Sequence, residues 1–257
     1  MELKIYQQEA LNTLTSFCKN YKESSGKVEE AFNNTLKNSE QFSEPYEPYL
    51  KVKESTAPYI CIRIPTGGGK TLIAAKSLKP VIEELYENDK TFLVIWLAPK
   101  DIIVNQTIKA LKDPKHPYRK AIDEDFPSTS INVMKLKDAL TNTFNKKTDI
   151  TILVGSMQSF NVGNDDIRKF YYLNSNYANF LENSKYKDEP SLANAIKEAS
   201  PYIIIDEAHK ARANLSLSNI INLNPSFVLE LTATPERNHK PNAGKYASNI
   251  IYSVSAS

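Results

Sequence analysis

The sequence predicts an α/β fold, in which a mainly parallel, doubly wound sheet is flanked by helices. Continuous apolar segments, the clearest of them at 92–98, are typical of strands buried on both faces of a parallel sheet. These segments alternate with stretches whose apolar residues recur at helical spacing. A chain of 257 residues with 41% hydrophobic content is long enough for one substantial core, or for a core plus a small appendage.

The helices are predicted from apolar residues that recur three and four positions apart. The first two cover 6–21 and 28–36, and two more cover 71–86 and 102–112. Pro80 is expected to bend or interrupt the third helix, because proline has no backbone donor and its ring clashes with the preceding turn.

The strands are predicted from short apolar runs. They cover 59–64, 92–98, 131–136, 150–154, 202–206, 226–231 and 249–254. The stretches 38–58 and 113–130 are rich in proline and polar residues, which predicts loops. The polar stretch 161–200 predicts a long connection with helical pieces.

Composition excludes several classes of protein. No apolar run is long enough to span a membrane, and the N-terminal residues lack the apolar segment of a signal peptide. The formal net charge is +2, so any contact with nucleic acid must come from a local face. Cys18 and Cys61 lack metal-ligand spacing and are expected to pack in the core. We therefore expect a cytoplasmic protein with reduced thiols and no membrane partner.

The most informative segment is IPTGGGKT at 64–71, between a predicted strand and a predicted helix. A phosphate-binding loop requires this context. Its glycines let backbone N–H groups approach phosphate oxygens, and the following helix directs its positive end to the same place. Lys70 is expected to reach the β- and γ-phosphates, and the Thr71 hydroxyl to ligate Mg²⁺. The residues expected to bind the nucleotide here are Thr66, Gly67, Gly68, Gly69, Lys70 and Thr71.

The segment departs from the strict motif at its first position, where Ile64 stands in place of a glycine. Taken alone, it is also compatible with a glycine-rich turn that carries an incidental Lys-Thr pair. A second motif downstream favours nucleotide binding.

That second motif is YIIIDEAH at 202–209, a short apolar strand that ends in two carboxylates. In open parallel sheets, ligands bind outside the carboxyl ends of the strands. We therefore expect Asp206 to hold the Mg²⁺ that Thr71 also contacts, and Glu207 to orient or deprotonate the attacking water. The alternative is a solvated helix start, which leaves the preceding apolar strand unexplained. The expected catalytic residues are Lys70, Asp206 and Glu207.

With these motifs in this order, the chain resembles the first RecA-like domain of superfamily 2 helicases and translocases, from Tyr6 to about Pro235. Members of that superfamily commonly begin the phosphate loop with an apolar residue, and 206–209 matches their DEAH box. The resemblance implies a RecA-like P-loop NTPase fold with ATP and Mg²⁺ as cofactors. It divides the chain into an N-terminal helical segment at 1–58 and a RecA-like ATP-binding domain at 59–257.

Two more elements resemble that family. The run TATP at 232–235 resembles motif III, which implies that His209, Thr232 and Thr234 couple hydrolysis to movement. A strand-end turn is the alternative. Tyr6-Gln7 resembles the adenine-recognition element, which implies that the Gln7 amide reads N6 and N7 of adenine. The alternative for Gln7 is a polar residue on the first helix.

The segments at 97–100 and 155–160 resemble motifs Ia and Ib, which in the family contact the nucleic-acid backbone. A surface loop is the alternative in each case. The residues implied to contact nucleic acid are Pro99, Lys100, Ser156 and Gln158.

Within the superfamily, the layout looks most like the Res subunits of type III restriction–modification enzymes. This implies double-stranded DNA as a partner, with a methylase subunit and a second RecA-like domain in the full-length chain. That second domain would supply the arginine fingers, because neither Arg212 nor Arg237 lies in such a context. We expect this chain alone to hydrolyse ATP very slowly, since losing an arginine finger costs about 10³–10⁵ in rate. Nothing in the sequence resembles a nuclease motif.

Three other functions remain open. An RNA helicase or nucleic-acid sensor with the same core would differ in its contacts to 2′-hydroxyls. A P-loop enzyme acting on a small molecule, such as a kinase, would not need the Thr-Ala-Thr element. A non-catalytic interaction module would not need intact Lys70, Thr71, Asp206 and Glu207.

Overall fold

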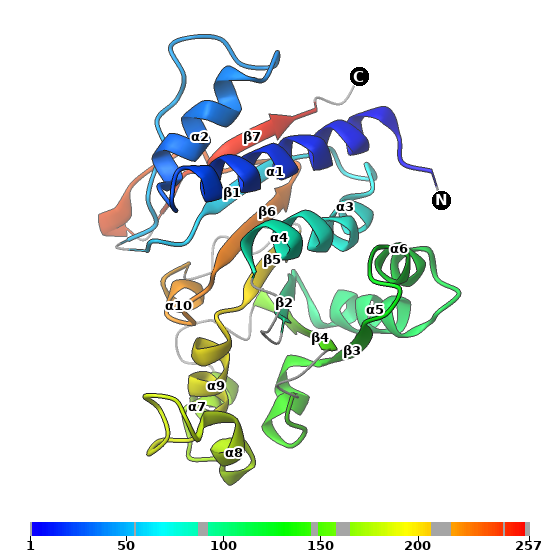
Figure 1. Ribbon diagram of the computed structural model, residues 1–257, viewed down its shortest axis with the longest axis vertical. Helices are drawn as coiled ribbons and strands as arrows, with labels where there is room; N and C mark the ends of the chain where they lie inside the picture. The colour runs from blue at the N-terminus through cyan, green and yellow to red at the C-terminus, as the bar shows by residue number, and fades with distance from the viewer. Residues whose placement is uncertain are drawn as a thin grey trace.

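The sheet of this protein is parallel throughout the part of the chain that the structure describes. The computed structural model describes residues 2–53, 55–86, 92–144, 149–157, 165–206, 217–243 and 245–254. The strands are β1 (Tyr59–Arg63), β2 (Phe92–Ala98), β3 (Ser130–Lys135), β4 (Asp149–Ser156), β5 (Tyr202–Asp206), β6 (Phe227–Thr232) and β7 (Ile250–Ser253). They form one seven-stranded sheet in the order β3-β4-β2-β5-β6-β1-β7, which confirms the predicted α/β class (Figure 1).

Helices connect the strands and cover both faces of the sheet (Figure 1). They are α1 (Ile5–Glu23), α2 (Val28–Lys37), α3 (Lys70–Lys76), α4 (Leu78–Leu85), α5 (Asp101–Lys112), α6 (Pro117–Asp125), α7 (Asp165–Phe170), α8 (Ala178–Leu181), α9 (Leu192–Ala199) and α10 (Leu217–Ile221). Short 3₁₀ turns lie at Leu136–Leu140, Ser175–Tyr177 and Pro241–Ala243.

The strands contribute side chains to two hydrophobic cores, one on each face of the sheet, because alternate side chains point to opposite faces. In β2, Val94 and Trp96 pack with residues of α1, α3, α4, α5 and α6. Leu93 and Ile95 pack on the other face, with residues of α7, α8, α9 and α10. This arrangement explains why strands of this sheet read as continuous apolar runs and not as alternating ones.

The two N-terminal helices share the core of the sheet. Phe17 of α1 and Phe32 of α2 are buried in the same cluster as the residues of β1 and β6. The ring of Phe17 contacts the ring of Phe227 on β6 edge-on, with centroids 5.9 Å apart. In Figure 1, α1 lies over the end of the sheet that contains β1 and β7. The first helix is thus in place to reach the loop that follows β1.

The predicted helix 71–86 is two helices, and they do not meet at Pro80. The division falls at Ser77, between α3 and α4. Pro80 lies in the first turn of α4, where the backbone N–H groups have no partner within the helix. A proline is therefore tolerated there without a kink.

The predicted loop 113–130 is wrong, because it contains α6. Pro117 occupies the first turn of this helix, and Nδ1 of His116 accepts a hydrogen bond from the backbone N–H of Tyr118 at 3.2 Å. Ala121 and Ile122 bury the inner face of the helix. The proline that suggested a loop starts a helix here, since its missing N–H is not needed at that position.

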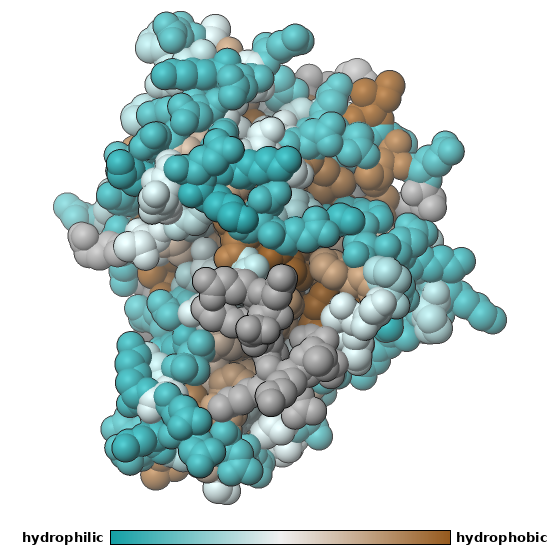
Figure 2. All heavy atoms as spheres, viewed as in Figure 1, coloured by the Kyte–Doolittle hydropathy of each residue, from teal (hydrophilic) through white to brown (hydrophobic). Residues whose placement is uncertain are grey.

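The outer surface is largely polar on the face seen in Figure 1, where hydrophilic residues predominate (Figure 2). No helix within the described residues is long and apolar enough to cross a membrane. Cys18 and Cys61 are both buried, in agreement with the packing role expected for them. Burial raises the pKa of the Cys18 thiol far above its ordinary value.

Candidate nucleotide site

The glycine-rich loop turns tightly between the end of β1 at Arg63 and the start of α3 at Lys70. Gly67 and Gly69 both have φ of +78°, a left-handed conformation that glycine adopts without strain. A side chain at Gly68 would place its Cβ 2.5 Å from Cγ2 of Ile64. Ile64 is fully buried beneath the loop, so an apolar residue fits at this first position of the motif.

Lys70 is held inside this loop. Its Nζ donates to the carbonyl of Pro65 at 3.1 Å and to that of Ile64 at 3.3 Å. The residue is only 4% exposed. The ammonium group therefore lies against the loop and does not extend into solvent.

Thr71 and Asp206 meet although 135 residues separate them in the chain. Oγ1 of Thr71 donates to Oδ2 of Asp206 at 3.3 Å. Asp206 is the last residue of β5 and is 4% exposed, while Thr71 lies in the first turn of α3. The structure thus brings together the two residues that the sequence predicts at one Mg²⁺.

The donor set suits Mg²⁺ bound together with phosphates. Mg²⁺ prefers oxygen ligands, and it is usually held by one or two carboxylates plus phosphate oxygens and water. Among the described residues, no group of three or more His, Cys, Asp or Glu side chains is arranged to hold a metal by itself. Both observations agree with a Mg²⁺ site in which Thr71 and Asp206 provide the protein ligands and phosphate oxygens provide the others.

The first turn of α1 also contacts the loop. The Tyr6 hydroxyl and Nε2 of Gln7 both donate to the carbonyl of Gly68, at 2.9 and 3.0 Å. Oε1 of Gln7 accepts from the backbone N–H of Lys4 at 2.9 Å. Gln7 is therefore beside the phosphate loop, with both ends of its amide engaged, and its role in reading adenine stays a prediction. The contribution of Tyr6 was not predicted, although an aromatic residue next to Gln7 was part of the resemblance.

The Thr-Ala-Thr segment follows β6 and is attached to β1. The carbonyl of Thr232 accepts from the backbone N–H of Ile64 at 2.9 Å, and Oγ1 of Thr232 accepts from the N–H of Thr234 at 3.2 Å. Thr232 is buried and Thr234 is exposed. Contacts from these hydroxyls to the Asp-Glu segment stay a prediction.

Several predicted residues lie outside the described residues. They are Glu207, His209 and Gln158, together with Arg212. Arg237 is exposed, as expected for a residue outside the catalytic set.

Of the residues predicted to contact nucleic acid, the three that the structure describes follow or end β2 and β4, at the edge of the sheet where the phosphate loop also lies. Ala98 and Ser156, the last residues of β2 and β4, are paired in register. Lys100 follows β2 and is exposed, whereas Pro99 and Ser156 are buried. Ile102, in the first turn of α5, is 65% exposed. Lys100, Asp101 and Ile102 are therefore all exposed at the start of α5.

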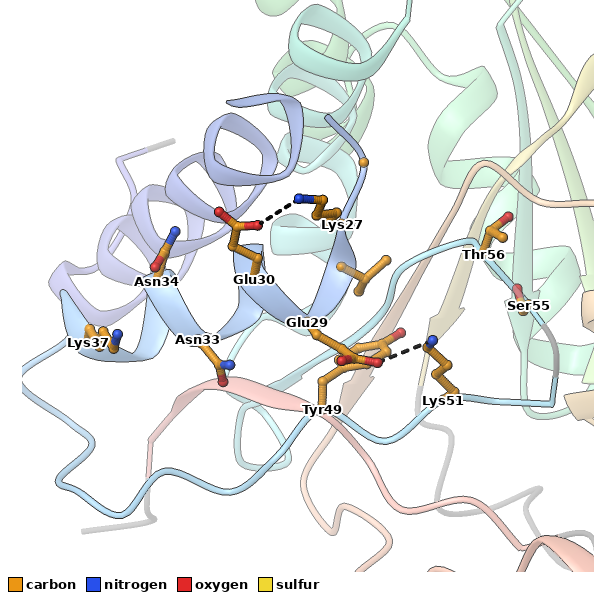
Figure 3. Close-up of a pocket in the computed structure, with 12 residues that line it drawn as sticks. Lys27, Glu29, Glu30, Asn33, Asn34, Lys37, Tyr49, Lys51, Ser55 and Thr56 are labelled. Carbon is orange, nitrogen blue, oxygen red and sulfur yellow. Dashed lines mark ion pairs between the residues drawn. The ribbon is translucent and has the colours of Figure 1, made fainter. Parts of the chain in front are cut away.

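A separate cavity of about 700 Å³ lies beside α2 (Figure 3). Two ion pairs line it, Lys51–Glu29 at 3.2 Å and Lys27–Glu30 at 3.7 Å. The cavity also includes Thr56, which precedes β1, whereas the phosphate loop follows β1. It is therefore at the other end of that strand from the nucleotide site.

The chain is similar to known proteins in sequence and in fold. The family model described as type III restriction enzyme, res subunit, matches residues 1–237. No curated protein was found to match the sequence. A solved structure of a nuclease-deletion mutant of the type ISP restriction-modification enzyme LlaGI, in complex with a DNA substrate mimic, is similar with 15% identity and a TM-score of 0.50. The match covers 99% of this chain and 20% of that one, so the chain spans about a fifth of its length.

Two further solved structures are similar over part of the chain. The UvsW helicase from bacteriophage T4 has 18% identity and a TM-score of 0.38, with 86% of this chain and 66% of that chain covered. The Sulfolobus solfataricus SWI2/SNF2 ATPase core, in complex with dsDNA, has 17% identity and a TM-score of 0.36, with 70% of this chain and 29% of that chain covered.

Proposed function

This chain belongs to the family of the type III restriction enzyme res subunit, and from that membership we propose that it is the ATP-binding motor lobe of a DNA helicase or translocase. In this proposal, ATP hydrolysis drives movement along double-stranded DNA. The wider protein is the Res subunit of a restriction enzyme, with a second RecA-like lobe and a modification subunit as partners.

The observation that carries the proposal is the hydrogen bond between Thr71 and Asp206, 3.3 Å long. It joins the phosphate loop to the acidic end of β5, so one bound nucleotide can contact both. Lys70 binds phosphate oxygens, and Thr71 and Asp206 hold Mg²⁺. Bound Mg²⁺ neutralises charge that develops on the phosphates. Glu207, next in the chain, orients the attacking water.

The glycines of the loop support this assignment. Positive φ at Gly67 and Gly69 presents the backbone of the loop in a conformation that residues with a Cβ rarely adopt. Such loops cradle phosphates through their N–H groups. Thr66 and Gly67 are exposed and so accessible to a ligand, while Gly68 is fixed from below by Ile64.

DNA is proposed to pass the carboxyl edge of the sheet near Lys100. The lysine is exposed and lies at the start of α5, where its charge and the backbone N–H groups suit phosphate. The similarity to LlaGI, whose structure contains a DNA substrate mimic, supports DNA over RNA.

ATP hydrolysis by the intact protein tests the proposal. We expect double-stranded DNA to raise the rate of ATP hydrolysis by about 10-fold or more, because such motors complete their catalytic geometry only when bound to nucleic acid. Asp206→Asn should abolish hydrolysis at every DNA concentration. Asp188→Asn, at an exposed position between α8 and α9, is the matched control. Stimulation by RNA alone would favour the RNA helicase. Hydrolysis indifferent to any nucleic acid would favour a small-molecule enzyme and contradict the proposal.

A further inference from the structure

We propose that Arg63 is a positioning residue that holds the Thr232–Thr234 segment in place relative to the phosphate loop. The inference rests on the proposed function, because it concerns the coupling of ATP hydrolysis to DNA. It is carried by contacts that join the last residue of β1 to the segment after β6.

The backbone of Arg63 is fixed from both sides. In the sheet it is in register with Thr232 of β6 and with Ser253 of β7. Its carbonyl accepts from the N–H of Val254 at 3.0 Å, and the next residue, Ile64, donates to the carbonyl of Thr232. The origin of the Arg63 side chain is therefore set by the sheet and not by a loop.

The side chain of Arg63 reaches the middle of the Thr-Ala-Thr segment. Its Nε donates to the carbonyl of Ala233 at 3.3 Å, across 170 residues of sequence. The side chain is only partly buried, so a change here does not open a cavity in the core. A guanidinium nitrogen that donates to a carbonyl forms a charge-assisted hydrogen bond, which is stronger than a neutral one.

Each of the three residues of the segment thus has one backbone group in a hydrogen bond. The carbonyl of Thr232 is bound by Ile64, the carbonyl of Ala233 by Arg63, and the N–H of Thr234 by Oγ1 of Thr232. Two of these three bonds come from Arg63, the last residue of β1, and from Ile64, the first residue after it. The segment is therefore fixed to the end of β1 from which the phosphate loop starts.

The connection continues beyond the segment. Glu236 exchanges hydrogen bonds with Ser248, through its N–H at 3.0 Å and its carbonyl at 2.9 Å. Thr234 lies between Ala233 and this second anchor and is exposed. Arg63 thus links the loop that binds phosphate to an exposed threonine that a second lobe or DNA can contact. Arg63 acts through this segment and is therefore a positioning residue, not a catalytic one.

Arg63→Met tests the inference in the intact protein, because methionine keeps an unbranched apolar stem and removes the donors. We expect ATP–Mg²⁺ affinity and hydrolysis without DNA to stay within about twofold, and DNA-stimulated hydrolysis to fall about 10-fold. Arg63→Lys retains a cationic donor and should restore part of the stimulation. Arg237→Met removes a cation from an exposed position beyond the same segment and should leave stimulation unchanged.

The results for the Arg63 variants can each contradict the inference in a distinct way. Stimulation of Arg63→Met equal to that of the unaltered protein would overturn the inference while leaving the proposed function intact. An equal fall in ATP affinity, basal rate and stimulated rate would also overturn it, because that pattern means a general loss of structure. If DNA does not stimulate the unaltered protein, the proposed function fails and the inference falls with it.

Discussion

Thr71 shows most directly how one side chain links the two distant motifs. The hydroxyl donates the hydrogen bond to Asp206, which the methyl group cannot do. Substitutions at this position can separate the chemistry of the hydroxyl from the packing of the side chain.

Thr71→Val should abolish the Mg²⁺ dependence of ATP binding, since valine keeps the shape and loses the ligand oxygen. The Asp206 carboxylate also loses a hydrogen-bond donor. We expect affinity in Mg²⁺ to fall by about 10-fold or more, which corresponds to about 1.4 kcal/mol. Calorimetric titration with and without Mg²⁺ measures this, and Thr71→Ser is the control that keeps the hydroxyl. Full Mg²⁺ dependence in Thr71→Val would contradict the assigned role.

Gly69 and Gly67 form a matched pair for a second test. Both have φ of +78°, but a Cβ at Gly69 would lie 2.4 Å from Nε2 of Gln7, whereas a Cβ at Gly67 meets nothing within 4 Å. Gly67→Ala should cost about 1–2 kcal/mol of unfolding free energy from backbone strain alone. Gly69→Ala should cost more, because it also displaces the Gln7 amide from Gly68.

Urea unfolding of both variants, alone and combined with Gln7→Ala, measures the difference. Removing the Gln7 side chain should bring the two alanine variants to nearly the same cost, as expected for coupled neighbours. If Gly69→Ala stayed more damaging in the Gln7→Ala background, the steric argument would be wrong.

At the scale of secondary-structure elements, α1 acts on the site through its first turn. Gln7 is buried against Gly68, while the adjacent Gln8 is exposed and bonds Asn12 of its own helix. The structure therefore selects Gln7 over Gln8 as the residue that touches the phosphate loop.

Gln7→Ala should weaken both ATP and GTP binding by about 3- to 10-fold, because it removes a hydrogen bond that holds the loop. The predicted reading of adenine would add a further loss for ATP alone. Gln8→Ala should leave both affinities unchanged. Competitive titration with the two nucleotides measures this. A selective loss of ATP affinity in Gln7→Ala would mean that the amide leaves Gly68 on binding and reads adenine.

The elements that could be predicted from sequence are those whose local pattern matches their environment. β2 and β5 were recognised because both of their faces are buried and their apolar runs are unbroken. α6 was missed because proline and charge mark both loops and helix starts, and only the packing of Ala121 and Ile122 decides between them. The division between α3 and α4 at Ser77 has no strong local signal in the sequence. The sequence therefore predicts the break at Pro80, the nearby proline.

The contacts at the site likewise include some that the sequence predicts and some that it does not. Lys70, Thr71 and Asp206 stand in sequence patterns that encode their chemistry, so their meeting was predictable. The contact from Arg63 to Ala233 joins residues 170 positions apart, and nothing near either residue signals it. Contacts of this kind follow from the register of β1 with β6, which the sequence alone does not specify.

At the scale of the whole molecule, buried tyrosines make stability sensitive to alkaline pH. Burial raises the pKa of Tyr202, Tyr177, Tyr86 and Tyr49 above the ordinary value. These phenols stay neutral in the folded state, while in the unfolded chain they ionise above about pH 10. Their contribution to stability is therefore complete below about pH 10 and is lost as pH rises toward the folded pKa values.

Tyr202 is the most informative position for measuring this effect. Its hydroxyl lies 2.7 Å from Oγ of Ser77, which also donates to the carbonyl of Ala74 at 2.7 Å, so Tyr202→Phe leaves Ser77 with a partner. Between pH 10.5 and 11, the free energy of unfolding should fall by about 1 kcal/mol less per pH unit in Tyr202→Phe than in the unaltered protein, a difference that approaches about 1.4 kcal/mol per pH unit at higher pH. Urea unfolding at pH 8 gives the cost of losing the hydroxyl, and the same measurement at pH 10.5 and 11 gives the change in slope. Equal slopes for the two proteins would mean that Tyr202 ionises as readily in the folded core as in the unfolded chain, which its complete burial between β5, α3 and α4 argues against.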